Sequence, residues 1–191
     1  MTGWSLFPSL QSHKKTLITL ITLALALPFA LGADKDKERE KLTAEVAESI
    51  EAFKKTDSTL KEFFTKSAGY VVFPKVAKGA MGVGAANGKG QLFEKGKVVG
   101  ETGLTQITIG LQLGGQVYYG IIFFEDEKTV KDFKEGNVEL SAQVSAVAAA
   151  EGASKNAKYK LGVAIFTVAR GGLMYEASVG GQKFSFKSYE K

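Results

Sequence analysis

The feature that most constrains the fold is a long two-residue alternation of apolar with small or polar residues, which begins near Gly69. The alternating segments are residues 107–113, 138–148, 173–179 and 184–186. Every second side chain of a β-strand lies on the same face, so this pattern predicts a sheet. Unbroken apolar runs at 117–124 and 161–166 indicate strands buried on both faces. We therefore expect about eight strands in a strongly curved, mostly antiparallel sheet, either open or closed into a barrel.

The glycine-rich stretch GAMGVGAANGKG (79–90) raises the question of phosphate binding. A glycine loop that binds nucleotides must lead from a strand into a helix. Here GQLFEKGKVVGE follows, which is typical of a strand, a turn and a second strand. We interpret Asn87-Gly88 as a hairpin turn, and Gly79, Gly82 and Gly84 as bends or close approaches of backbone.

Helices are predicted before the sheet and once within it. An apolar stripe at helical spacing comprises Leu42, Val46, Ile50 and Phe53. A short second helix is predicted from a capping box at Thr59 and Glu62, and another over 126–134. The fold class is therefore α+β, with amphipathic N-terminal helices packed on the sheet. The stripe has two interpretations, a core face and a face that enters a bilayer, and we favour the core.

The N-terminal segment has the layout of a secretory signal. Lys14 and Lys15 precede the apolar run TLITLITLALALPFALGA, which ends in small residues. We expect residues 1–32 to be a cleaved signal peptide, residues 33–66 to be helical and residues 67–191 to be the β-rich core, with 34–191 forming one domain. This predicts a periplasmic or secreted protein. The alternative is that residues 16–31 are retained as an anchor. The chain has no cysteine, so it is not a lipoprotein.

Composition excludes most catalytic mechanisms. The only histidine is His13, within the expected signal, and there is no cysteine, so the processed chain lacks Ser-His-Asp, Cys-His and His/Cys zinc chemistry. Loss of Lys14 and Lys15 lowers the formal charge from +5 to +3, which is too mild for a nucleic-acid partner. We expect a protein that is not an enzyme, with no catalytic residues, cofactor or metal.

Several ordered blocks resemble the SYLF domain family. They are AGYVVFPKVAKGAMGVGAANGKGQLF (68–93), GLTQITIGLQLGGQVYYGIIFF (103–124), F-x-x-G (133–136), AQVSAVAAAEG (142–152) and ARGGLMYEASVGG (169–181). The resemblance covers about residues 40–187. It implies binding of phospholipids of the phosphoinositide type at a membrane, and in some fungal members binding of actin. Actin is not an expected partner in an exported protein.

The cations that could meet anionic head groups are Lys54, Lys55, Lys75, Lys78, Lys89 and Arg170. The ordinary alternative is a solvated surface for the lysines and a turn-stabilising role for Arg170. The alternative function is a structural or protein-interaction module that binds an envelope protein in the periplasm.

Overall fold

The computed structural model describes the backbone of residues 14–136 and 146–190, and the side chains of these residues outside 14–33, 110–112 and 172–180. The chain divides into two compact units, Met1–Lys41 and Leu42–Lys191. The elements in chain order are α1 (Lys14–Thr56), η1 (Ser58–Leu60), α2 (Lys61–Lys66), β1 (Gly69–Glu94), β2 (Lys97–Phe124), α3 (Glu127–Lys134), β3 (Val147–Ala148), η2 (Ala153–Asn156) and β4 (Val163–Ser188). The mixed α and β composition agrees with the sequence.

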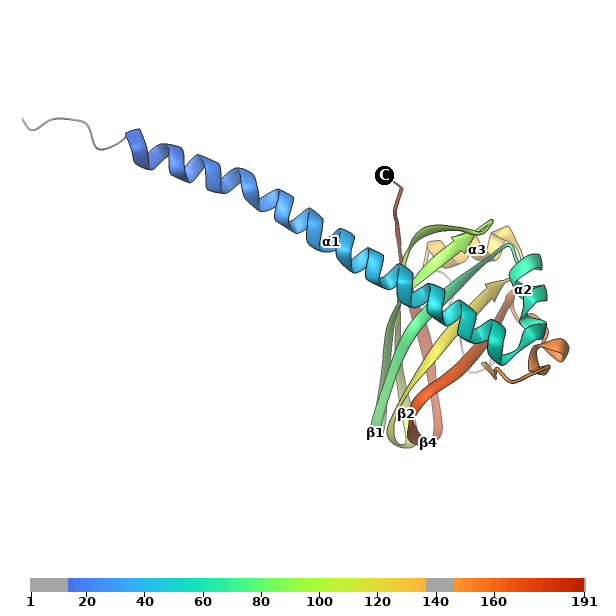
Figure 1. The fold of residues 1–191 in the computed structure, drawn as a ribbon. Coiled ribbons are helices and arrows are strands. Elements are labelled where there is room, and N and C mark those ends of the chain that lie inside the picture. The colour runs from blue at the N-terminus through green and yellow to red at the C-terminus, as the bar shows by residue number, and fades with distance from the viewer. Residues whose placement is uncertain (1–13, 137–145, 191) are drawn as a thin grey trace, which may run out of the picture. The chain divides into compact units, whose positions relative to one another are not determined.

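The described strands form one sheet in the order β1-β2-β4-β3. Figure 1 labels its three long strands, β1, β2 and β4. β2 pairs antiparallel with both β1 and β4, and the short β3 pairs parallel with β4. β1 and β3 are the edges of this sheet, so the barrel alternative is not supported. Three long strands replace most of the roughly eight predicted short ones, because pairing continues through positions such as Asn87-Gly88, where a strand was expected to end. The strong curvature stays a prediction, and most of the segment 138–148 lies outside the described residues.

The hairpin turn was placed wrongly. Asn87 and Gly88 lie inside β1, opposite Thr105 and Leu104 of β2. The chain turns instead at Lys95-Gly96, where φ is 50° and 76°. Gly82, with φ of 80°, lies at a register shift between Met81 and Val83, as expected for a glycine at a bend.

One hydrophobic cluster collects residues from both halves of each long strand. Val71 and Leu92 come from the two ends of β1, and Ile165 and Phe184 from the two ends of β4. Both halves of these strands therefore face the same core. Phe133 of α3 is buried in this cluster, and its ring centroid lies 5.0 Å from that of Phe124.

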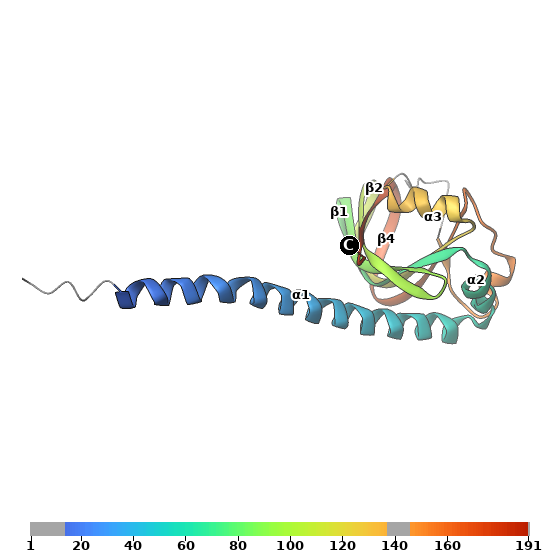
Figure 2. The ribbon, with the colours of Figure 1, turned by 90° about the horizontal axis from the view of Figure 1, so that it is seen from above.

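A second cluster lies on the other face of the sheet. Leu42, Val46 and Phe53 of α1 are buried there with Phe123 and Phe166 of the sheet. Ile50 is partly buried against the same cluster. Seen from above, α3 and the C-terminal part of α1 lie on opposite sides of the strands (Figure 2). Among the residues whose side chains are described, no helix is long and apolar enough to cross a membrane.

Two of the short helices, η1 and α3, are capped by aspartates. Asp126 caps α3 by accepting from the backbone N–H of Thr129 at 2.7 Å, which confirms the helix predicted over 126–134. The capping box at Thr59 was wrong, because Asp57 caps η1 by accepting from the Thr59 N–H at 3.0 Å. A buried carboxylate is the stronger acceptor at this position, and the chain enters η1 two residues earlier than predicted.

Candidate functional site

A concavity of about 830 Å³ lies where both halves of β1 meet residues from β2 and β4. Its lining residues are Lys75, Ala77, Lys78, Gly79, Ala85, Asn87, Gly115, Gln116, Val117, Arg170 and Gly171. The register explains their convergence, since Lys78 lies opposite Gln116 and Gly79 opposite Gly115. Small residues at these positions leave the space open.

The lining of this concavity is cationic. Lys75, Lys78 and Arg170 carry positive charge, Asn87 and Gln116 supply carboxamides, and no lining residue is a carboxylate. Cations grouped in a hollow whose lining residues include no carboxylate create a local potential that attracts anions. The sequence proposed these three residues for head-group contact, and the structure brings them together.

A β-bulge sets the direction of the Arg170 side chain. Val117 pairs with Gly171 and Tyr118 with Ala169, so Arg170 is the extra residue between two ladder positions. The interpretation of Arg170 as a turn residue was therefore wrong, because it lies within β4. A bulge redirects a side chain out of the regular alternation, which is how a strand residue comes to line the concavity.

The Arg170 side chain is fixed at two points. Its Nη1 donates to the carbonyl oxygen of Pro74 at 3.2 Å, and its Cζ lies 4.6 Å from the centroid of the Tyr119 ring. The Tyr119 hydroxyl in turn donates to Glu48 at 3.4 Å. Because a guanidinium has five N–H donors, the bond to Pro74 leaves donors for an anion. A positioned guanidinium loses less side-chain entropy on binding than a mobile lysine.

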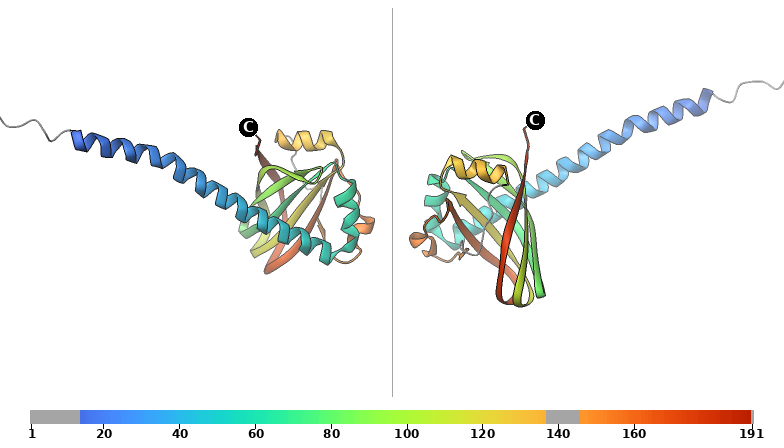
Figure 3. Two further views of the ribbon diagram at one scale, coloured as in Figure 1. Left: turned by 45° about the horizontal axis from the view of Figure 1, so that its top comes forward. Right: turned by 180° about the vertical axis from the view of Figure 1, so that it is seen from behind.

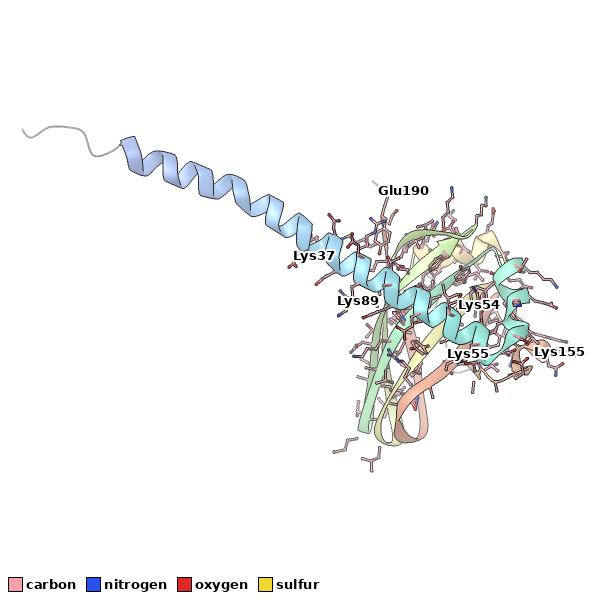
Figure 4. The ribbon with its side chains drawn as sticks, viewed as in Figure 1. Lys37, Lys54, Lys55, Lys89, Lys155 and Glu190 are labelled. Atoms are coloured by element: carbon pink, nitrogen blue, oxygen red, sulfur yellow. The ribbon has the colours of Figure 1, made fainter. Side chains whose placement is uncertain are left out.

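The other predicted cations lie elsewhere (Figure 4). Lys54 and Lys55 belong to the last turn of α1, where Lys54 pairs with Glu51 at 2.9 Å and lies 5.7 Å from the Phe64 ring centroid. Lys89 of β1 is 3.9 Å from Glu101. None of the three lines the concavity. The stripe residues Leu42, Val46 and Phe53 are buried in the core rather than presented to solvent.

A group of exposed apolar side chains beside the concavity, here called the apolar patch, was not predicted from the sequence. Its members are Met81, Val83, Ile107, Ile109 and Leu113, each between 61% and 84% exposed. The alternation at 107–113 was interpreted only as a strand, and no exposure was predicted for its apolar side chains. The signal that could have found the patch is charge, because no charged residue occurs between Lys78 and Lys89.

A second concavity, of about 710 Å³, lies between α2 and the η2 region. Its lining carries both signs of charge, with four lysines (Lys61, Lys66, Lys155, Lys158) and two glutamates (Glu62, Glu125). Burial raises the pKa of the Tyr159 hydroxyl to about 12, with Glu125 adding to the shift, so this tyrosine stays neutral. The mixed lining favours no one class of ligand.

A buried carboxylate joins the two chain segments that form this second concavity. Asp57 accepts from the backbone N–H groups of Thr59, Gly152 and Ser154, the last at 2.7 Å, and from the Thr59 hydroxyl. Burial acts to raise the pKa of Asp57, but these hydrogen bonds together outweigh it and hold the pKa below its usual value. Its oxygens are therefore occupied in holding the fold. In the described part of the chain no group of three or more His, Cys, Asp or Glu could hold a metal ion.

Two comparisons with known proteins bear on this chain. Residues 105–190, from the middle of β2 to the end of β4, match the family model described as Ysc84, Las17-binding protein actin regulator. The chain is also 31% identical over 126 residues to Beta cell expansion factor A of Aeromonas veronii. This similarity covers 65% of the chain and 48% of the relative, so the chain spans about half the length of that protein.

Proposed function

On the premise that residues 105–190 form a domain of the Ysc84 (SYLF) family, we propose that this protein is a non-enzymatic binder of anionic lipid surfaces. The observation that carries the proposal is the concavity that unites Lys75, Lys78 and Arg170 without a lining carboxylate. The proposed ligand group is the phosphate of a phospholipid head group, of the phosphoinositide type or a simpler anionic lipid.

The chemistry of the three side chains suits phosphate. The planar guanidinium of Arg170 can donate two parallel hydrogen bonds to phosphate oxygens. Lysine ammonium groups act as point charges beside it, and each cation near an anionic surface contributes about 1 kcal/mol. The carboxamides of Asn87 and Gln116 add donors for the remaining oxygens of the head group.

The cellular setting belongs to the same proposal. The N-terminal segment supports export to the periplasm or beyond, where the lipid surface would be that of the envelope. The family description names Las17 binding and actin regulation for the family. Las17 and actin are not expected as partners in that compartment.

The test is co-sedimentation of the full chain with vesicles of zwitterionic phosphatidylcholine, with or without phosphatidylglycerol. The N-terminal apolar segment is common to all samples, so the difference between the two lipid mixtures reports on the cations. The variant K75Q/K78Q/R170Q should lose roughly a hundredfold in affinity for anionic vesicles, at about 1 kcal/mol for each cation.

The matched control is K54Q/K55Q/K89Q, which removes the same charge from outside the concavity. It should retain most of the binding to phosphatidylglycerol vesicles. Equal losses in the two variants would mean diffuse attraction and no site, which contradicts the proposal. If the chain binds neither kind of vesicle but captures one envelope protein from a periplasmic extract, the alternative function as a protein-interaction module is favoured.

A further inference from the structure

The apolar patch is continuous across two strands. Met81 lies opposite Leu113 in the ladder between β1 and β2, and Val83 lies opposite Ile109. Directly opposed residues of an antiparallel pair present their side chains on the same face of the sheet. The patch is therefore a single apolar surface, larger than the isolated hydrophobic residues that surfaces normally carry.

The patch lies where the long strands bend. Gly82 and Gly114 have φ of 80° and 115°, and each is adjacent to a patch residue. Figure 3 shows the bends of β1, β2 and β4 at the end of the sheet remote from α3. Neither hydrophobic cluster contains a patch residue, so these side chains do not serve the core.

Charged residues are sparse at this end of the sheet. β2 has no charged residue between Glu101 and Glu125, and β1 has none between Lys78 and Lys89. On β4 the interval from Arg170 to Lys183 contains one, Glu176. The uncharged middle of β1 is bordered by Lys78 and Lys89, and the middle of β4, which contains Glu176, is bordered by Arg170 and Lys183. Lys78 and Arg170 also line the cationic concavity.

We infer that the apolar patch inserts into the acyl region of an anionic bilayer while the cationic concavity holds a head group beside it. This inference rests on the proposed function and specifies how the same site meets the membrane. Apolar side chains enter the hydrocarbon, while the cations at their border stay at head-group level. The geometry fits a shallow insertion of the patch alone, with the two faces of the sheet that α1 and α3 cover remaining outside the bilayer.

Charge complementarity favours a bilayer over a second copy of the chain. Two copies meeting through their patches would gather Lys78, Lys89 and Arg170 of both chains around one interface. Like charges that face each other across an interface oppose association. An anionic lipid surface reverses the sign of this contribution, so it stabilises the contact that a second copy would destabilise.

The absence of cysteine makes a depth measurement clean. The full chain carrying Ile109→Cys is labelled with the environment-sensitive fluorophore NBD, and Lys131→Cys on the exposed face of α3 is the matched control. Thermal unfolding of both labelled proteins should match that of the unlabelled chain. On phosphatidylglycerol vesicles, NBD at position 109 should shift to the blue and be quenched by lipids brominated in the acyl chain. NBD at position 131 should do neither.

Mutation of the patch gives a second measurement. V83S/I109S should weaken binding to phosphatidylglycerol vesicles by at least about tenfold, because two apolar side chains no longer gain from leaving water. Binding that stays within about twofold of the unmutated chain would overturn the insertion, since little apolar surface would then be leaving water.

The remaining outcomes separate the two proposals. Selective binding to anionic vesicles with an unquenched probe at position 109 overturns insertion and leaves head-group binding in place. Quenching at 109 that is equal on both lipid mixtures, and unchanged in K75Q/K78Q/R170Q, supports insertion and overturns the head-group site. A blue shift without vesicles that grows with protein concentration, together with a dimer in sedimentation equilibrium, shows that a second copy covers the patch and overturns the inference.

Discussion

Gly90 lies against the backbone of Val72 so closely that a Cβ atom on it would come within 2.3 Å of the Val72 carbonyl oxygen. The two residues belong to opposite halves of β1, so this contact is where the strand meets itself. Gly90→Ala should lower the free energy of unfolding by about 1–3 kcal/mol, because backbone must move to admit the methyl group. Denaturation in urea measures the change. Gly181→Ala is the control, since nothing lies within 4 Å of its added Cβ, and it should stay within about 0.5 kcal/mol.

The Asp57 carboxylate should make stability depend on acid pH. Its pKa is lower in the folded chain than the ordinary aspartate pKa of 3.8, so its charged form contributes stability above that value. The contribution is lost as the pH falls through the folded pKa. Asp57→Asn should cost about 1–3 kcal/mol at neutral pH, because buried donors lose a charged acceptor.

The measurement is the melting temperature of both proteins from pH 7 to pH 2. The gap between the unmutated chain and Asp57→Asn should narrow below about pH 3.8. Glu190→Gln, at an exposed position, should leave the profile unchanged. A constant gap across the range would show that Asp57 acts through its shape rather than its charge.

Phe53 tests the role of the N-terminal helix stripe. Its side chain is fully buried in the cluster with Phe123 and Phe166, so Phe53→Ala should cost about 3–5 kcal/mol. Lys54→Glu with Lys55→Glu supplies the contrast, because charge reversals at the surface usually stay within about 0.5 kcal/mol. Differential scanning calorimetry and vesicle sedimentation together separate stability from binding. A Phe53→Ala protein that melts normally and no longer binds vesicles would mean that the helix is a membrane anchor.

Arg170→Lys separates a positioned guanidinium from a simple positive charge. An ammonium group cannot bond Pro74 while stacking flat on the Tyr119 ring and still offer paired donors to a phosphate. Binding to phosphatidylglycerol vesicles should fall by about three- to tenfold, at constant net charge. Titration of labelled vesicles measures it, with Lys89→Arg as the control that should have no effect. Unchanged affinity for Arg170→Lys would mean that charge alone matters at this position.

The pattern of residues along the chain was sufficient to predict elements that depend mainly on neighbours in sequence. Val130 and Phe133 at helical spacing, after Asp126, predicted α3, and the structure has them buried in that helix. The turn predicted at Asn87-Gly88 was wrong because of contacts distant in sequence. Asn87-Gly88 has the residues of a tight turn, but pairing with β2 keeps it extended, and a Cβ on Gly88 would lie 2.8 Å from the Lys75 carbonyl oxygen. That glycine is needed for close approach of backbone rather than for positive φ.

The sequence identified the cations of the candidate site but not their convergence in one concavity. Arginine and lysine identities marked six cations, but only the register of β1 with β2 and of β2 with β4 shows that Lys75, Lys78 and Arg170 share a concavity. These residues are far apart in the chain, and no local periodicity relates them. The bulge that redirects Arg170 depends on the partner strand as well, so a single sequence does not reveal it.

The position of β4 in the sheet has a consequence for the order of folding. β2 is the middle one of the three long strands, and one of its two hydrogen-bonded neighbours, β4, is the last of the described strands along the chain. Val163 and Phe166 of that strand belong to different hydrophobic clusters. A ribosome that has released only the first two long strands therefore holds a hairpin with an open edge and two unfinished cores. Contacts this distant in sequence form late, so neither hydrophobic cluster can be completed until β4 has been synthesised.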